Sequence, residues 1–529
     1  MATALAALCA AAAVLLVPYA LRLARYIGEV LRRNRLTRDV PGPRVYPVVG
    51  SLPAFLALMR DPHDELRKLL DKYGSTVRLP LLDRTLLVVM EPDDLQVVCT
   101  HPALATKPVE YARFLGSHIG QGLLNINEPL HRRHRKAITP SLHLDILHDF
   151  VAVFAKQAEV LADRVDERAA DGAPGEVFNV QPEFGRMAGA ALLQTVLTAP
   201  LHNMTEAETA AHVDALNETN LVIVYRALRP WWTNDTVFRL LSNQAEKFMR
   251  TAAAMESMVC RVLNAKTAEL SAGLPPPPRR RMAFLDHMLR SKESEVMSRA
   301  ELRDELKTFL FVGSSTSMDL MSLITLAMAM YGDVQRRVHQ ELDEVFGAPG
   351  TPGWDRPVVP EDLAHLAYLE RTIKEVLRYA PPVPFVFRIA TDDVRLPSGT
   401  LVPRGAYVGM VPAGTHRLER HFPDPYRFDP DRFLPENSAG RHPYAFVPFS
   451  AGSRNCIGMR YALMLAKTAT ATLLRRFAVH TAPGGPRGFH EVSVDTGATI
   501  MVRGGVQVRL QRRAPRPPGT PSPPTPAAH

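Results

Sequence analysis

The sequence predicts a mainly α-helical protein with a minor β part and a membrane anchor at its N-terminus. Three observations support this fold class. Residues 143–270 carry apolar side chains at helical spacing, with little β-type alternation. A second long helical pattern spans residues 298–331. The segment from Ala2 to Leu21 contains no charged side chain.

Composition and charge exclude several classes of protein. The chain has 529 residues, of which 46% are apolar and 22% charged, and these values exclude wholesale disorder. Its four cysteines are too few for a disulfide scaffold. Of the net charge of +9, residues 22–40 contribute +4, Arg279 to Arg281 contribute +3, and Arg512, Arg513 and Arg516 contribute +3. The rest of the chain sums to −1, so we do not expect a nucleic-acid partner.

The N-terminal segment predicts a retained transmembrane signal-anchor over residues 1–21. Its twenty uncharged residues are just long enough to cross a hydrocarbon core of about 30 Å as a helix. The basic juxtamembrane residues 22–40 follow this segment, whereas a cleaved signal peptide has its basic residues in front. We therefore expect a protein of the endoplasmic reticulum membrane with a cytosolic catalytic domain. Cysteines outside the anchor are then free thiols, and the sequons at Asn203, Asn217 and Asn234 are unused.

The remaining elements follow from local composition. Pro41-Gly42-Pro43 stops the first helix and begins one main domain, residues 41–510. Apolar periodicity predicts helices, and short β-rich runs predict strands. The expected strands lie at Thr76–Leu79, Thr85–Met90, 393–411 and 498–510, and the later helices at 298–331, 333–346, 362–379 and 459–474. Pro275 to Pro278 predict a surface linker, and the proline-rich residues 511–529 predict a disordered tail.

The strongest local signal surrounds Cys456, which directly precedes the apolar helical run from residue 459. A thiolate is stabilised by the positive end of a helix, and Arg454 adds positive charge. Gly452 and Gly458 let the backbone approach a flat object closely, because they lack a Cβ. Together with Phe449, this pattern suits a metal held in a planar ring. The alternative is a buried structural cysteine beside a helix.

This stretch resembles the haem-binding loop of the cytochrome P-450 superfamily, Phe-x-x-Gly-x-Arg-x-Cys-x-Gly, at every fixed position. The resemblance implies the cytochrome P-450 fold, with a long central helix over a haem held by the cysteine loop. It also implies haem b (iron protoporphyrin IX), whose iron takes Cys456 as axial ligand. In that family the thiolate pushes electron density onto the iron and favours O–O cleavage. Phe449, Gly452, Arg454 and Gly458 are then cofactor-binding residues.

Further segments match the same family in the expected order. Glu375 and Arg378 resemble its Glu-x-x-Arg pair, and Arg432 resembles the second arginine of a buried network under the haem loop. An i,i+3 pair of this kind lies on one helix face, although an isolated pair is usually a solvated surface pair. Arg388 resembles the arginine that reaches a haem propionate. The resemblance covers about residues 40–510.

Weaker signals resemble the family-4 clan of fatty-acid ω-hydroxylases. They are the stretches Gly120 to Leu124, His134 to Pro140, Ala283 to Asp286 and, in part, Glu305 to Ser317. The resemblance makes Arg135 a further propionate ligand. Many relatives have a tryptophan four residues before this arginine, where this chain has His131. His131 is either a propionate ligand or a surface histidine.

The central helix departs from the family pattern. Gly313 and the oxygen-side hydroxyl of Thr316 are present, but Ser315 stands where the family has an acid. A serine orients water and cannot supply a proton as a carboxylic acid does. Val312 replaces the glutamate that esterifies haem in the ω-hydroxylase clan, so no covalent bond beyond Cys456–iron is expected. A Thr hydroxyl bonded to the i−4 carbonyl would loosen the helix beside the iron.

Three functions remain open from these residues. The first is a monooxygenase that inserts one atom of O2 into a lipophilic substrate, a fatty acid, sterol or xenobiotic. Its electrons come from NADPH through cytochrome P-450 reductase, with cytochrome b5 as a further candidate donor. The second is a lipid-hydroperoxide isomerase or dehydratase of the same fold, and the third a non-enzymatic haem binder. Thr316 favours the first, and Pro230 to Trp232 suggest an access route at the bilayer surface or a packed core.

Overall fold

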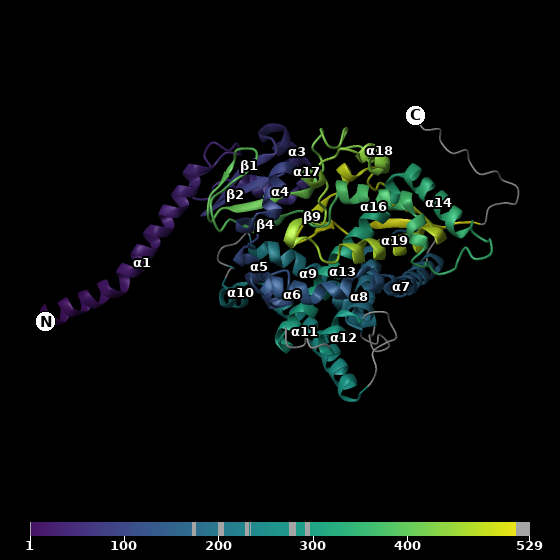
Figure 1. The fold of residues 1–529 in the computed structure, drawn as a ribbon, viewed down its shortest axis with the longest axis horizontal. Coiled ribbons are helices and arrows are strands. Elements are labelled where there is room, and N and C mark those ends of the chain that lie inside the picture. The colour runs from purple at the N-terminus through teal and green to yellow at the C-terminus, as the bar shows by residue number, and fades with distance from the viewer. Residues whose placement is uncertain are drawn as a thin grey trace.

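The computed structural model describes residues 2–171, 176–198, 206–227, 232, 234–273, 282–290 and 297–514. Helices form most of the body, and a small sheet lies at the end next to the N-terminal helix (Figure 1). The larger helices are α1 (Ala2–Leu36), α2 (Leu52–Arg60), α3 (Pro62–Tyr73), α4 (Pro92–Thr100), α5 (Val109–Ile119), α6 (Leu130–Ile138), α7 (Leu144–Asp171), α8 (Gln181–Thr195), α9 (Glu206–Ala227), α10 (Asp235–Leu241), α11 (Ala245–Ser271), α12 (Phe284–Arg290), α13 (Arg299–Met330), α14 (Gly332–Phe346), α16 (Ala367–Tyr379) and α19 (Met459–Arg476). Short helices are α15 (Asp362–His365), α17 (Pro412–Thr415), α18 (Pro435–Ser438) and the 3-10 turns η6 (Pro430–Phe433) and η8 (Gly452–Arg454).

Within the described residues, the strands form four small sheets. The largest has the order β1-β2-β7-β4, in which β2 and β7 are parallel and the other pairs antiparallel. A three-stranded sheet has the order β3-β11-β8, and β5–β6 and β9–β10 are two-stranded. The strand bounds are β1 Thr76–Leu81, β2 Arg84–Val89, β3 Phe178–Asn179, β4 Val386–Ile389, β5 Val394–Arg395, β6 Leu401–Val402, β7 Tyr407–Met410, β8 Phe477–Thr481, β9 Val494–Thr496, β10 Ile500–Val502 and β11 Gln507–Arg512. These sheets confirm the mainly helical class with a minor β part.

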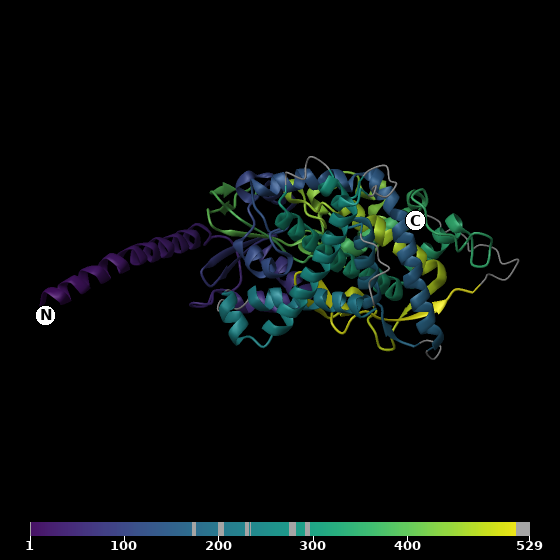
Figure 2. The ribbon, with the colours of Figure 1, turned by 90° about the horizontal axis from the view of Figure 1, so that it is seen from below.

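Helix α1 is longer than the predicted anchor, because it continues through the basic segment to Leu36. Figures 1 and 2 both show it projecting away from the body. Its described apolar side chains Tyr19, Leu21 and Leu23 are more than half exposed. Among the described residues, one helix is long and apolar enough to span a membrane by composition, namely α13, and 78% of its most apolar window is buried in the body. The anchor over residues 1–21 stays a prediction.

Helix α13 forms the centre of the helical body. It begins with a capping box, in which Ser298 Oγ accepts from the Glu301 N–H and Glu301 Oε2 accepts from the Ser298 N–H at 2.8 Å. The helix packs against α8 and α19 within the main hydrophobic core. A Cβ at Gly313 would lie 2.8 Å from a methyl group of Leu192. The small residue therefore allows α8 to pack closely against the middle of α13.

Several predicted boundaries change in the structure. The helix expected over 362–379 is two helices, α15 and α16, because Leu366 leaves the helical conformation. The β-rich stretch 393–411 contains β5, β6 and β7, and β4 precedes it outside the predicted range. The linker at Pro275 to Pro278 and the tail from residue 515 lie outside the described residues.

The predicted access route is described only at Trp232, since Pro230 and Trp231 lie outside the described residues. Trp232 is partly buried and meets Phe238 edge-on, with 6.0 Å between the ring centroids. This contact favours the packed-core alternative for that tryptophan.

The capping box of α13 provides a test of the fold. Ser298→Ala removes the acceptor at the helix start, so we expect the free energy of unfolding to fall by about 0.5–2 kcal/mol. Denaturant unfolding of the full-length protein in detergent measures this change. Ser271→Ala, an exposed serine at the end of α11, is the matched control and should change stability by less than about 0.5 kcal/mol. Equal effects of the two substitutions would contradict the role of the cap.

Candidate functional site

The cysteine loop is a compact turn in front of α19. The Cys456 N–H donates to the Phe449 carbonyl at 2.9 Å and closes the loop, while Gly458 is the N-cap residue of α19. The Cys456 side chain reaches solvent, although burial is the largest of the causes that shift its pKa. A thiol that solvent reaches at such depth lies at the wall of a recess. The alternative of a packed structural cysteine is therefore wrong.

Burial raises the pKa of the Cys456 thiol above its ordinary value. The Gly458 N–H, at the start of α19, and the Arg135 guanidinium both oppose this rise, as a helix N-terminus and a nearby cation should. Arg454 donates from its guanidinium to the Ile126 carbonyl at 2.8 Å, and its predicted role in stabilising the thiolate stays a prediction. The protein alone therefore favours the protonated thiol over the thiolate.

The two glycines of the loop serve different purposes. Gly452 has a φ of +71°, and a Cβ there would lie 2.0 Å from the Cys99 carbonyl oxygen at the end of α4. Packing within the protein therefore requires glycine at position 452. The prediction that Gly452 serves close approach to a flat object is wrong. A Cβ at Gly458 would meet no protein atom within 4 Å. Gly458 therefore leaves open space beside Cys456, as the prediction requires.

Four cations lie around this recess: Arg388 on β4, Arg454 on η8, Arg135 on α6, and Lys107 in the segment before α5. Arg388, Arg454 and Lys107 are at least 90% buried and Arg135 is half-buried. In the part of the chain that the structure describes, none of the four makes an ion pair with a carboxylate. Buried charges are normally paired, so the cluster lacks its anions.

The pKa values of the four cations are shifted as expected for buried charges that lack carboxylate partners. Burial lowers the pKa of all four groups, and that of Arg454 falls to about 10. Arg388 and Arg454 lower the pKa of Lys107 further by repulsion. The guanidiniums bond mainly to backbone carbonyls, with Arg388 donating to Phe387 at 2.9 Å and Arg135 to Asn455 at 2.8 Å. This donor set fits a flat group that carries two carboxylates and a metal for Cys456.

Lys107 was not predicted, because a lone lysine in front of a helix forms no recognisable sequence pattern. Arg388 was predicted, and β4 holds it opposite Val408 of β7. His131 is 3% exposed, and its Nδ1 lies 3.1 Å from Glu128 Oε1. Burial and Arg454 lower its pKa to about 4, so it is neutral at pH 7. The alternative of a surface histidine is wrong.

The middle of α13 shows the predicted hydroxyl contact. Thr316 Oγ1 donates to the Val312 carbonyl at 2.8 Å, which is the i−4 bond expected to loosen the helix. Ser315 is buried at this point, as are Ser314 and Ser317. In the described chain this helix therefore offers several buried hydroxyl groups at the place where the family pattern has an acid.

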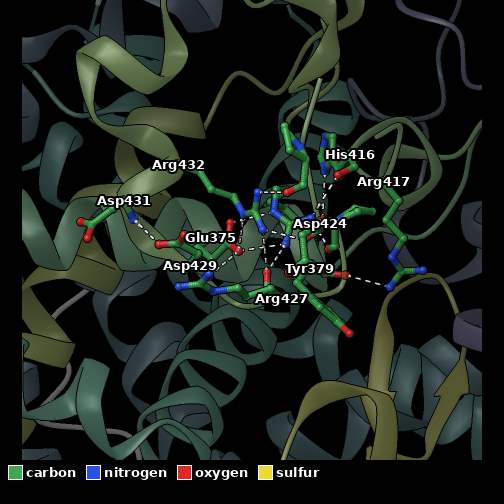
Figure 3. A network of polar contacts seen from close by, with 12 residues as sticks. Glu375, Tyr379, His416, Arg417, Asp424, Arg427, Asp429, Asp431 and Arg432 are labelled. Atoms are coloured by element: carbon green, nitrogen blue, oxygen red, sulfur yellow. Dashed lines mark hydrogen bonds and ion pairs between the residues drawn. The ribbon is translucent and has the colours of Figure 1, made fainter. Parts of the chain in front are cut away.

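A buried ion pair supports the cysteine loop from the side of α16. Arg378 donates from Nε to Glu375 Oε2 at 2.7 Å and from Nη2 to Oε1 at 2.8 Å, and both side chains have no exposed surface. Figure 3 shows Glu375 in this network, with Arg432 and Asp429 beside it. Arg432 Nε lies 3.6 Å from Glu375 Oε1, and the Asp429 N–H donates to the same oxygen. Burial raises the pKa of Glu375, and Arg378 opposes the rise. The structure thus brings together the three residues of the predicted network.

His416 connects this network to the cysteine loop, and no pattern in the sequence indicated it. The Val447 N–H donates to Nε2 of His416 at 2.9 Å, so Nδ1 carries the proton and donates to the Arg378 carbonyl at 3.2 Å. The ring is fully buried, and burial lowers its pKa to about 3. Val447 lies two residues before Phe449, the first residue of the cysteine loop.

The fold and this site define a haem-thiolate protein. A family model described as Cytochrome P450 matches residues 40–493. The chain is 30% identical to cytochrome P450 4V2 of Rattus norvegicus, over 93% of each chain. It is also 30% identical to cytochrome P450 4c3 and to cytochrome P450 4d2 of Drosophila melanogaster, over 85% and 92% of this chain and 86% and 97% of those proteins. The chain belongs to the cytochrome P450 family, with similarity to its family 4, and is a monooxygenase.

Substitution of the ligand provides the first test of the site. Cys456→Ser removes the thiolate, so the ferrous–CO complex should lose the absorption band of a thiolate-ligated haem. Difference spectra of the full-length protein measure this. Cys99→Ser, a buried cysteine beside the loop, is the control and should keep the band. An unchanged spectrum in Cys456→Ser would defeat the ligand assignment.

The buried ion pair provides a second test. Arg378→Ala leaves the Glu375 charge buried without its bidentate partner, so unfolding should become easier by about 3–5 kcal/mol. Arg432→Ala should lower the free energy of unfolding by less than Arg378→Ala does, because the distance from Arg432 to Glu375 is longer. Denaturant unfolding and haem content measure both changes. Wild-type haem content and stability in Arg378→Ala would contradict the network.

Proposed function

We propose that this monooxygenase inserts one oxygen atom of O2 into a lipophilic substrate, with electrons from NADPH delivered by cytochrome P-450 reductase. One observation carries the proposal: a solvent-accessible cysteine lies in an interior recess among four cations that have no carboxylate partner in the described chain. Family membership supports the oxygen chemistry. The substrate class and the electron donor are the parts that we infer.

The residues of the recess divide between the two ends of the prosthetic group. Cys456 would hold the iron, and four cations would neutralise the propionates. A haem iron on a thiolate supplies the electron density that favours O–O cleavage. His131 is neutral at pH 7 and would contribute a hydrogen bond rather than charge. Val312 is apolar, so we expect no ester bond between α13 and the haem. The four cations are Arg388, Arg454, Arg135 and Lys107.

The hydroxyl groups of α13 would guide protons to the oxygen side. Thr316 already donates its proton to Val312, so its oxygen is available to accept a hydrogen bond from water. Ser315 and Ser317, both buried, can hold and orient further water. We infer that such hydroxyl groups replace the missing acid of the family pattern, with Gly313 allowing the close packing of α8 against this part of the helix.

A second function is favoured by one observation, the serine at position 315. Rearrangement or dehydration of a lipid hydroperoxide requires neither O2 nor reductant nor a proton relay, so an acid is dispensable there. The retained hydroxyl of Thr316 favours the monooxygenase.

The substrate and the location rest on clan similarity and on α1. A medium or long fatty acid or a related lipid is the substrate class that the resemblance to the ω-hydroxylase clan favours. We infer that α1 anchors the protein in the endoplasmic reticulum membrane with the catalytic domain in the cytosol. The reductase, and cytochrome b5 where it takes part, would dock on the side of the cysteine loop.

Two parallel reactions test the proposed function. One contains fatty acids, NADPH, reductase and isotopically labelled O2, and the other contains a fatty-acid hydroperoxide without reductant. We expect labelled alcohol in the first reaction, and its position on the chain tests the clan similarity. Rapid conversion in the second reaction alone would establish the isomerase instead. Cys456→Ser is the control for haem-independent conversion.

The sequons provide a test of the membrane topology. We expect Asn217 and Asn234 to remain unmodified when the protein is made in a eukaryotic cell, because glycosylation occurs on the opposite side of the membrane. A glycosidase-induced mobility shift would overturn the cytosolic location. A variant with a sequon added in front of Ala2 is the positive control and should shift.

A further inference from the structure

A buried carboxylate near the start of α13 joins three separate parts of the chain. Glu305 has no exposed surface. Its Oε1 lies 2.7 Å from Nδ1 of His134 on α6, which is equally buried, and its Oε2 accepts from the Leu123 N–H at 3.0 Å. A buried carboxylate is stable only when its oxygens are paired in this way. These contacts therefore fix α6 and the chain around Leu123 relative to α13.

His134 has a second carboxylate on its other side. Its Nε2 lies 3.4 Å from Oε1 of Glu301, which precedes Glu305 by one helical turn and also pairs with Arg133 of α6. A protonated imidazole offers one donor to each of two carboxylates. Burial raises the pKa of Glu305, and His134 and the Leu123 N–H oppose the rise. Charge thus holds α6 against the first turns of α13.

The chain around Leu123 lies directly on the same turns of α13. We call residues 119–127 the bridging segment. The Gln121 N–H donates to Asp304 Oδ2 at 2.8 Å, and the Thr308 hydroxyl donates to the Ile119 carbonyl at 3.3 Å. A Cβ at Gly122 would lie 2.1 Å from Thr308 Oγ1, so glycine is needed for this close approach. One end of the bridging segment is therefore fixed to α13.

The other end of the bridging segment holds two of the four cations around Cys456. The Ile126 carbonyl accepts from Arg454 at 2.8 Å. Asn127 Oδ1 accepts from the Lys107 N–H at 2.8 Å and from Arg454 Nη2 at 3.3 Å, and its Nδ2 donates to the Lys107 carbonyl at 3.1 Å. Arg454 and Lys107 therefore depend on a short segment that α13 holds in place.

Helix α6 carries the third cation. Arg135 directly follows His134 and donates to the Asn455 carbonyl at 2.8 Å, next to Cys456. Because neighbouring residues of a helix share one rigid backbone, the contacts of His134 also place Arg135. Arg388 is held differently: it lies on β4, which pairs with β7, and its guanidinium donates to a carbonyl of its own strand.

We propose that Glu305 and His134 are positioning residues for haem binding, which hold Arg135, Arg454 and Lys107 at the places where the propionates bind. Both residues act through these cations and the bridging segment. The inference rests on the proposed placement of the propionates among the cations, and it is independent of the substrate and of the electron donor.

The rate of haem loss tests this proposal without turnover. The ferric, full-length protein in detergent is mixed with excess apomyoglobin, and the change in the Soret band reports the transfer of haem. Glu305→Gln keeps the size of the side chain but removes its charge, so haem loss should become about tenfold faster, as expected for a weakened hydrogen bond to a charged group. His134→Asn, which reaches one carboxylate at most, should have the same direction of effect.

Glu183→Gln is the matched control for general destabilisation. Glu183 on α8 is a carboxylate with only 1% of its side chain exposed, and it pairs with Arg186 at 2.7 Å and with Arg168 at 2.8 Å. Its substitution should lower the melting temperature and leave the rate of haem loss unchanged. Wild-type haem loss in both Glu305→Gln and His134→Asn would overturn the positioning role.

Double variants separate positioning from a merely structural effect. Arg135→Ala and Arg388→Ala should each accelerate haem loss. Glu305→Gln combined with Arg135→Ala should accelerate it by less than the product of the two single effects, because one of the cations to be positioned is already gone. Glu305→Gln combined with Arg388→Ala should give the full product, since β7 holds Arg388.

The remaining outcomes each decide the proposal. Full products in both double variants would mean general destabilisation, and the proposal would be wrong. An unchanged rate in Arg135→Ala would refute the placement of the propionates and this inference with it. Should Glu305→Gln fail to fold, His134→Asn takes its place in both double variants. Failure to form labelled alcohol in turnover would defeat the proposed function and leave these rates as they are.

Discussion

The Glu375–Arg378 ion pair is the interaction on which the architecture of the site depends. Two charges without exposed surface are expensive to bury, and they are tolerated only when all their hydrogen bonds are made. Arg378 satisfies this condition with the carboxylate and with the carbonyl groups of His416, Pro425 and Arg427. The pair therefore binds chain segments that have no regular secondary structure of their own and fixes them behind the cysteine loop.

On the other side of the cysteine loop, buried charges lack such partners among the described residues. There the cations lack carboxylates among the described residues, the thiol of Cys456 has a raised pKa, and an open space lies beside Gly458. Each of these groups is unfavourable in the protein alone. A single group that brings a metal ion and two carboxylates would relieve all of them together, so haem binding and the stability of this region should be strongly coupled.

The sequence predicts the parts of this site that depend on short spacing. Cys456, Glu375, Arg378 and Arg432 are recognisable because their neighbours along the chain define them. Lys107 and His416 were not predictable, since their roles arise from contacts with residues far away in the sequence. Gly452 was predicted for the wrong reason, because its neighbour, the Cys99 carbonyl, belongs to a different helix. The end of a helix at Leu366 likewise depends on tertiary packing that apolar periodicity does not reveal.

The low pKa of His416 makes the stability of the cysteine loop depend on pH. Its folded pKa of about 3 lies below the ordinary 6.5, so the contribution of the neutral ring is complete above about 6.5 and is lost as the pH falls towards 3. Protonation would put a second donor on the ring and turn the Val447 N–H away. At neutral pH the connection is fully formed, and below about 6.5 the free energy of unfolding falls because the unfolded state takes up a proton that the buried ring does not.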